Sequence, residues 1–75
     1  MFAGVLINVD PAKTKAAYEQ IRSIEGVANI TAVFGRYDLI AMIRALDLND
    51  GAAIVAKIRN VNGVIATETL IATTV

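Results

Sequence analysis

The residues best suited to chemistry stand together in one segment, Gly35-Arg36-Tyr37-Asp38. This segment combines backbone N–H groups, a cation, an aromatic ring and a carboxylate. Backbone N–H groups can receive a carboxylate, and the carboxylate of Asp38 can receive an ammonium group. A free amino acid carries both groups, so the segment could bind one. The alternative is a plain hairpin turn, in which Gly35 supplies a positive φ and Tyr37 packs on a neighbour.

A second polar segment, Thr67-Glu68-Thr69, interrupts an apolar stretch near the end of the sequence. If this stretch is a strand, Thr67 and Thr69 share one face because side chains alternate along a strand. Together they could hold a ligand. The preference of threonine for strands is by itself a sufficient explanation for them.

Residues typical of catalysis are scarce. The sequence has no histidine and no cysteine, which removes the commonest general base and any thiolate metal site. It also lacks a nucleophile elbow and the glycine patterns of nucleotide-binding loops. Asp47 and Asp50 form a carboxylate pair, but a helix start explains them better as capping residues. We therefore expect no catalytic residue, no metal and no cofactor.

Composition limits what kind of protein this is. The 75 residues suffice for one domain, 1–75, and seven basic residues balance seven acidic ones, so no nucleic-acid footprint is expected. The hydrophobic fraction is 56%, against an average of roughly 45–50%. No apolar run approaches the ~18–20 residues of a membrane span, and no signal-peptide pattern is present. We expect a cytoplasmic protein whose surplus apolar surface faces another subunit.

The elements that must position the polar segments follow from hydrophobic periodicity and turn residues. Asp10 and Pro11 predict a helix start, Gly26 predicts the end of that helix, and Asp47 starts a second one. The predicted elements are strands at 2–9, 27–34, 38–45 and 64–74, and helices at 12–23 and from Asp47 to about Arg59. This β-α-β-β-α-β order predicts an α+β, ferredoxin-like fold, with two helices on one face of a four-stranded antiparallel sheet.

Both faces of the predicted sheet are apolar. An antiparallel sheet with one face in water should alternate apolar and polar residues, and these strands do not. The face without helices would be a larger apolar patch than monomers usually expose, so two sheets are predicted to pack face to face in a two-fold dimer. Four residues interrupt the pattern and could mark a rim or a pocket: Asn29, Thr31, Arg44 and Glu68. The alternative is a poorly soluble monomer with two misassigned strands.

At these motifs the sequence resembles a known family. The matching pieces are Gly35-Arg36-Tyr37-Asp38-Leu39, Asp47, Asn62-Gly63-Val64 and Thr67-Glu68-Thr69, in order across nearly all 75 residues. The sequence is similar to the effector-binding (RAM) domain of the Lrp/AsnC (leucine-responsive, feast/famine) transcription regulators. The resemblance implies dimers joined through their sheets, rings of dimers that are often octamers, and an amino-acid effector bound between dimers. It implies a site at Gly35, Tyr37, Asp38, Thr67 and Thr69, and Arg36 stands where many relatives carry another residue.

Regulators of that family also carry an N-terminal helix-turn-helix domain, and this sequence begins at the first strand of the effector domain. It looks like the stand-alone version and is not expected to bind DNA directly. The leading hypothesis is an oligomeric amino-acid-sensing module, not an enzyme, that modulates transcription by co-assembly with a full-length regulator. The alternatives are a ligand-free assembly module, an ACT-like amino-acid-binding domain, and a small dimeric ferredoxin-like enzyme. The absence of histidine weakens the enzyme hypothesis.

Overall fold

The computed structural model describes residues 1–75 and confirms the predicted order of elements. They are β1 (Phe2–Val9), α1 (Thr14–Arg22), β2 (Val27–Ala32), β3 (Leu39–Arg44), α2 (Leu48–Arg59) and β4 (Val64–Ile71). The four strands form one sheet in the order β2-β3-β1-β4, and every neighbouring pair is antiparallel. This is the ferredoxin-like α+β fold.

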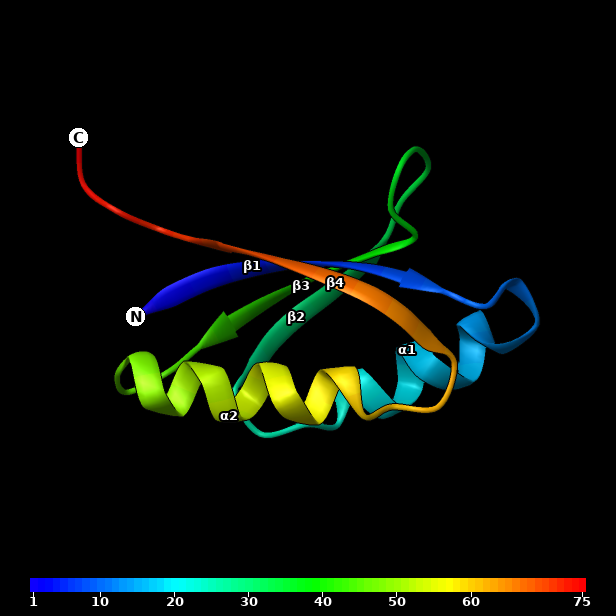
Figure 1. Cartoon of the computed structure of the whole chain (residues 1–75), viewed down its shortest axis with the longest axis horizontal. Coiled ribbons are helices and arrows are strands. Elements are labelled where there is room, and N and C mark those ends of the chain that lie inside the picture. Colours follow the sequence, from blue (N-terminus) through cyan, green and yellow to red (C-terminus); the bar gives the residue numbers. More distant parts are fainter.

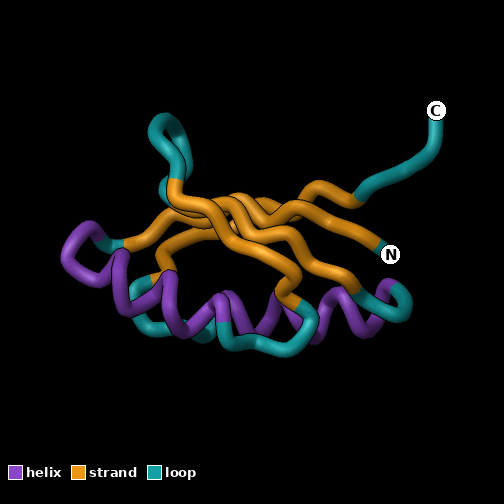
Figure 2. The backbone as a smooth tube through the Cα atoms, turned by 180° about the vertical axis from the view of Figure 1, so that it is seen from behind, coloured by secondary structure: helices purple, strands orange, loops and turns teal.

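The molecule has two layers. Both helices lie on one side of the sheet, and the connection between β2 and β3 rises on the other side (Figures 1 and 2). We call the side of the sheet without helices the open face. No helix is long and apolar enough to cross a membrane.

The first helix begins differently from the prediction. The carboxylate of Asp10 accepts a hydrogen bond from the backbone N–H of Ala12, as expected of a cap. The N–H of Lys13 also donates to the carbonyl of Asp10, and this i to i+3 bond tightens the first turn into a 3-10 helix. That turn spans Pro11–Lys13, so α1 runs over Thr14–Arg22 instead of 12–23.

The start of α2 is as predicted. The carboxylate of Asp47 accepts a 2.8 Å hydrogen bond from the N–H of Asp50, which satisfies one of the free donors at a helix start. Gly51 lies within α2 although glycine is a poor helix former, and close packing against Met1 explains its position. It is buried, and a Cβ at this position would lie 2.7 Å from Cε of Met1.

The hydrophobic core lies between the sheet and the helices. Every second residue of β1 is buried in it, and the helices contribute residues at the predicted helical spacing. Its members are Ala3, Val5, Ile7, Val9, Ala17, Ile21, Ile30, Leu39, Ala41, Ile43, Ala45, Ile54 and Ile58. Because these side chains are buried between the two layers, the face of each strand that carries them points toward the helices.

Three strands are shorter than predicted. β2 ends at Ala32 instead of residue 34, and β3 spans Leu39–Arg44 instead of 38–45, because Val33 and Asp38 close the loop between them. β4 ends at Ile71 instead of residue 74. It stops there because β1 begins at Phe2, whose carbonyl accepts the last hydrogen bond, from the N–H of Ala72.

The open face is apolar, as the sequence predicts. The register of the strands places Phe2, Leu6, Ile40, Met42 and Leu70 on it. Phe2 and Leu70 are the most exposed of these, at 48% and 54%. The four interrupting residues lie on the same face, at the two edge strands and the end of β3: Asn29, Thr31, Arg44 and Glu68.

Candidate functional site

The predicted turn is part of a longer loop. The β2–β3 loop comprises residues 33–38 and is closed by a 2.9 Å hydrogen bond from the N–H of Val33 to the carbonyl of Asp38. Gly35 has a φ of 119°, a conformation that glycine adopts readily. Gly35 and Arg36 are exposed, and the loop projects beyond the open face (Figure 1). The backbone N–H groups of Gly35 and Arg36 make no hydrogen bond within the chain and are therefore presented to solvent or to a neighbouring molecule.

Asp38 anchors this loop. One carboxylate oxygen, Oδ2, accepts a 2.9 Å hydrogen bond from the backbone N–H of Val9. That N–H lies at the irregularity in the pairing of β1 with β4. A second hydrogen bond holds the loop against β1: the side-chain amide of Asn8 donates to the carbonyl of Arg36 at 2.7 Å. Asp38 therefore has a structural role, and its Oδ1 is left to receive another donor.

Tyr37 reaches across the open face to β4. Its hydroxyl donates a 2.7 Å hydrogen bond to Oε1 of Glu68. This hydrogen bond raises the pKa of Tyr37 above its ordinary value of 10.0. The loss of hydration and the negative charge of Glu68 also raise this pKa, whereas the positive charge of Arg36 lowers it. Glu68 thus belongs with the loop. The sequence marks it as part of a polar segment and as one of the four residues that interrupt the apolar face, but does not link it to Tyr37, which is 31 residues away.

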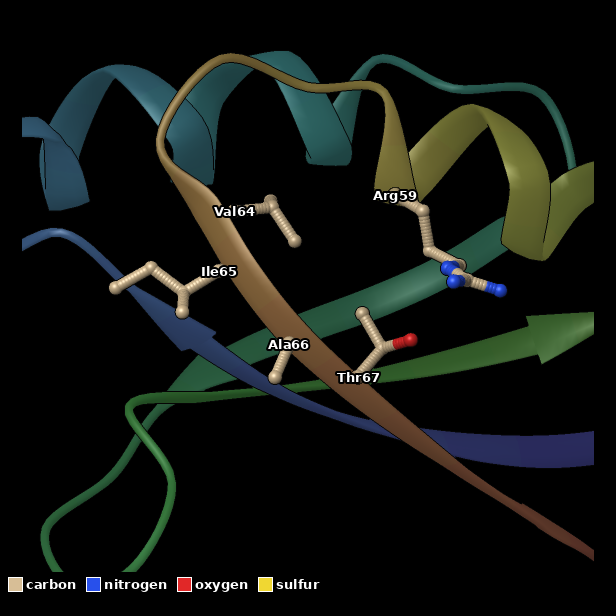
Figure 3. Close-up of a pocket in the computed structure, with 5 residues that line it drawn as sticks. All are labelled: Arg59, Val64, Ile65, Ala66 and Thr67. Carbon is tan, nitrogen blue, oxygen red and sulfur yellow. The ribbon is translucent and has the colours of Figure 1, made fainter.

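Thr67 and Thr69 lie on the opposite side of the sheet. They pair with Ile7 and Val5, whose side chains are buried under the helices, so the two threonines also face the helix layer. Figure 3 shows Thr67 facing Arg59, the last residue of α2, across the space between α2 and β4. The six predicted site residues therefore form two groups on opposite faces, and a single chain does not bring them together.

The threonines line a groove between α2 and β4, which we call the α2–β4 groove. It consists of two cavities, of about 320 Å³ and about 290 Å³. Thr67 lines the first and Thr69 the second, and Arg59 lines both. The second cavity is mostly apolar. Sequence reasoning did not single out Arg59, since a cation at a helix end is common.

No group of three or more acidic side chains that could hold a metal ion is present. What the arrangement offers is hydrogen bonding and two cations without a salt bridge: Arg36 and exposed N–H groups on the loop, hydroxyls on β4, and Arg59 facing Thr67. These groups can bind an anion or a small polar molecule, and no nucleophile is paired with a base among them.

The fold and the groove together define a class, a small α+β domain with a partly apolar recess and few polar side chains, as ligand-binding sites usually have. The Lrp/AsnC ligand binding domain model matches residues 3–74, and the chain belongs to this family. It is a family of regulatory domains, not of enzymes. No match is found among curated proteins.

Solved structures share the fold of this chain. TTHA0845 from Thermus thermophilus is 35% identical with a TM-score of 0.93, over 99% of this chain and 94% of that one. AsnC from E. coli is 18% identical with a TM-score of 0.81, over 99% of this chain and 55% of AsnC. The transcriptional regulator NMB0573 from Neisseria meningitidis, solved with L-Met, is 16% identical with a TM-score of 0.86, over 97% of this chain and 49% of that one. The chain thus spans about half of each of the two regulators.

The contact between Tyr37 and Glu68 predicts a pH effect. The hydrogen bond needs the neutral phenol, and the folded pKa lies above the unfolded one. Its contribution to stability is therefore complete below pH 10 and is lost as the pH rises through the folded pKa. In a Tyr18→Phe background, absorbance at 295 nm should show Tyr37 ionising above pH 10, and Glu68→Gln should lower that midpoint. An unchanged midpoint would mean that the contact does not persist in solution.

Proposed function

We propose that the chain is a single domain, 1–75, that senses a free amino acid at contacts between its copies and has no catalytic activity. The observation that carries this proposal is the division of the site residues between two faces of the sheet. The loop group, Gly35 to Asp38, and the threonine group, Thr67 and Thr69, cannot touch one small ligand within one chain. A ligand that uses both groups must lie between two copies.

The first level of assembly in this proposal is a dimer through the open face. That face carries five large apolar side chains around the two central strands, and burying them against a second copy removes them from water. The polar residues at the edges of the face would then form the rim, where interfaces are usually polar. A two-fold axis that lies between the two sheets, parallel to them, makes the same patch serve both copies.

The second level joins dimers into a ring, an octamer or a similar closed assembly. The β2–β3 loop projects from each subunit, so it can reach the α2–β4 groove of a neighbouring dimer. The amino acid then bridges the two. A ligand that binds only the assembled form stabilises it by mass action, and this couples the amino-acid concentration to assembly.

Family membership supports a regulatory output for this domain. Co-assembly with a full-length Lrp/AsnC-type regulator, through the same open face, would carry the amino-acid response to a DNA-binding partner in the cytoplasm. Direct DNA binding by this chain is not part of the proposal, because its net charge is zero. L-Met is bound by the Neisseria relative, which supports an amino acid as the ligand class here.

A second candidate function is a ligand-free assembly module. The hydrogen bond from Val9 N–H to Asp38 favours it, because the carboxylate proposed to receive an ammonium group already serves the fold. In that case the loop is a structural contact between subunits and the groove stays empty. The two candidates differ in whether free amino acids stabilise the protein.

A thermal-shift screen against the twenty amino acids tests the proposal. A ligand at 100 times its Kd adds about 2.7 kcal/mol, and each kcal/mol raises the Tm of a two-state domain this size by roughly 4–8 °C. We expect a clear shift with one or a few amino acids, reduced in Thr69→Val, which keeps the side-chain shape and loses the hydroxyl. A flat response across the panel would favour the ligand-free module.

A further inference from the structure

We propose that Arg59 binds the carboxylate of the ligand in the α2–β4 groove. This inference rests on the proposed function, since it specifies how the threonine side of the site holds the amino acid. Arg59 is the one residue that lines both cavities of the groove. Its side chain leaves the end of α2 and faces Thr67 on β4 (Figure 3).

The charges around Arg59 suit an anion. No acidic residue lines either cavity, and the single salt bridge within the chain joins Arg22 to Glu19. The guanidinium is therefore free to pair with an external carboxylate. Arginine is well suited to this because its planar fork can make two parallel hydrogen bonds to one carboxylate.

The backbone of β4 supplies further donors. β4 is an edge strand and pairs only with β1. Ala72 donates its N–H to β1, and donors alternate along an antiparallel strand, so Leu70 and Glu68 also point inward. The N–H groups of Thr69 and Thr67 consequently point outward from the free edge of the sheet. These N–H groups and the two hydroxyls are the hydrogen-bonding groups that β4 offers beside the groove lined by Arg59.

The second cavity defines the rest of the ligand. Its lining includes the apolar side chains of Met1, Leu48, Val55 and Ile71, and Thr69 and Arg59 are its polar residues. A ligand whose carboxylate sits at Arg59 would direct its side chain along this apolar wall. Leucine and methionine, whose side chains are apolar like this wall, therefore serve as probe ligands.

Arg59 has an alternative role, since a cation in the last turn of a helix interacts favourably with the helix dipole. Lys57 provides the matched control. It stands in the same last turn but lines a different recess, together with Glu25 and Asp50. If only the dipole matters, removal of either charge should have a similar effect. If Arg59 binds a carboxylate, the two variants should differ.

The test is calorimetric titration of the wild type, Arg59→Met and Lys57→Met with leucine and leucinamide, and with methionine and methioninamide. A charge-assisted hydrogen bond is worth about a tenfold to hundredfold preference, so the wild type and Lys57→Met should bind the acids that much more tightly than the amides. Arg59→Met should lose this preference, and Arg59→Lys should regain part of it.

The outcomes separate the two proposals. If Arg59→Met still prefers the acids tenfold, the inference about Arg59 is wrong while the sensing function stands. If charged or aromatic amino acids bind and aliphatic ones do not, the assignment of the apolar cavity is wrong. If no amino acid binds the wild type at all, the proposed function itself fails, and this inference fails with it. Circular dichroism of each variant verifies that it is folded.

Discussion

Replacing Ile40 with glutamate should convert the proposed dimer into a folded monomer. Ile40 lies on β3, near the middle of the open face, where the register places it between Leu6 and Thr31. In a sheet-to-sheet dimer the new carboxylate would be buried without a partner, which costs several kcal/mol. We expect a dimer at least about 100-fold weaker. Size-exclusion chromatography with light scattering, over a range of protein concentrations, measures the change.

The matched control for this variant is Leu46→Glu. Leu46 is 91% exposed and follows β3 in the connection to α2, so it is not on the open face. The same charge introduced there should leave the dimer unchanged. Equal dissociation of both variants would point to an effect of charge alone, and a wild type that runs as a monomer would contradict the sheet-to-sheet dimer.

The largest effect on folding stability is expected for Gly26→Ala. Gly26 has a φ of 100°, which is strained for other residues and costs about 1–3 kcal/mol. A Cβ there would also overlap Cδ1 of Ile54 and lie 3.0 Å from its Cγ1. Ile54 is only 5% exposed, so it cannot move without disturbing the core, and such overpacking costs about 1–3 kcal/mol more.

Gly35→Ala separates these two causes. Gly35 has a similar φ of 119°, but a Cβ there would meet no atom within 4 Å. The two variants share the backbone strain, and only Gly26→Ala adds the overlap. Urea denaturation should therefore show a larger loss of unfolding free energy for Gly26→Ala. If the two losses are equal, the packing of Ile54 against the turn before β2 contributes nothing.

The features that the sequence predicted well have local causes. Asp47 marks the start of α2, and Gly26 takes the positive φ of the turn before β2, because capping and turn formation depend on neighbouring residues. The apolar open face also follows from the sequences of β1 and β3, in which almost every residue is apolar and no apolar–polar alternation is present. These strands are predictable because they are short apolar runs bounded by turn residues.

The arrangement of the candidate site could not be predicted in the same way. The sequence shows that Thr67 and Thr69 share a face, but the strand register decides which face it is. The hydrogen bond between Tyr37 and Glu68 joins residues far apart in the chain. Arg59 becomes notable only when α2 is packed beside β4. All three features depend on tertiary contacts that no local pattern contains.

The central claim is that copies of this chain assemble and bind an amino acid between them. Native mass spectrometry of the wild type, with and without leucine, methionine and valine, tests both parts in one measurement. We expect even-numbered assemblies, with added ligand mass that grows with the number of subunits and a shift toward the larger assembly when the ligand is present. A monomer that takes up none of these amino acids would contradict the account.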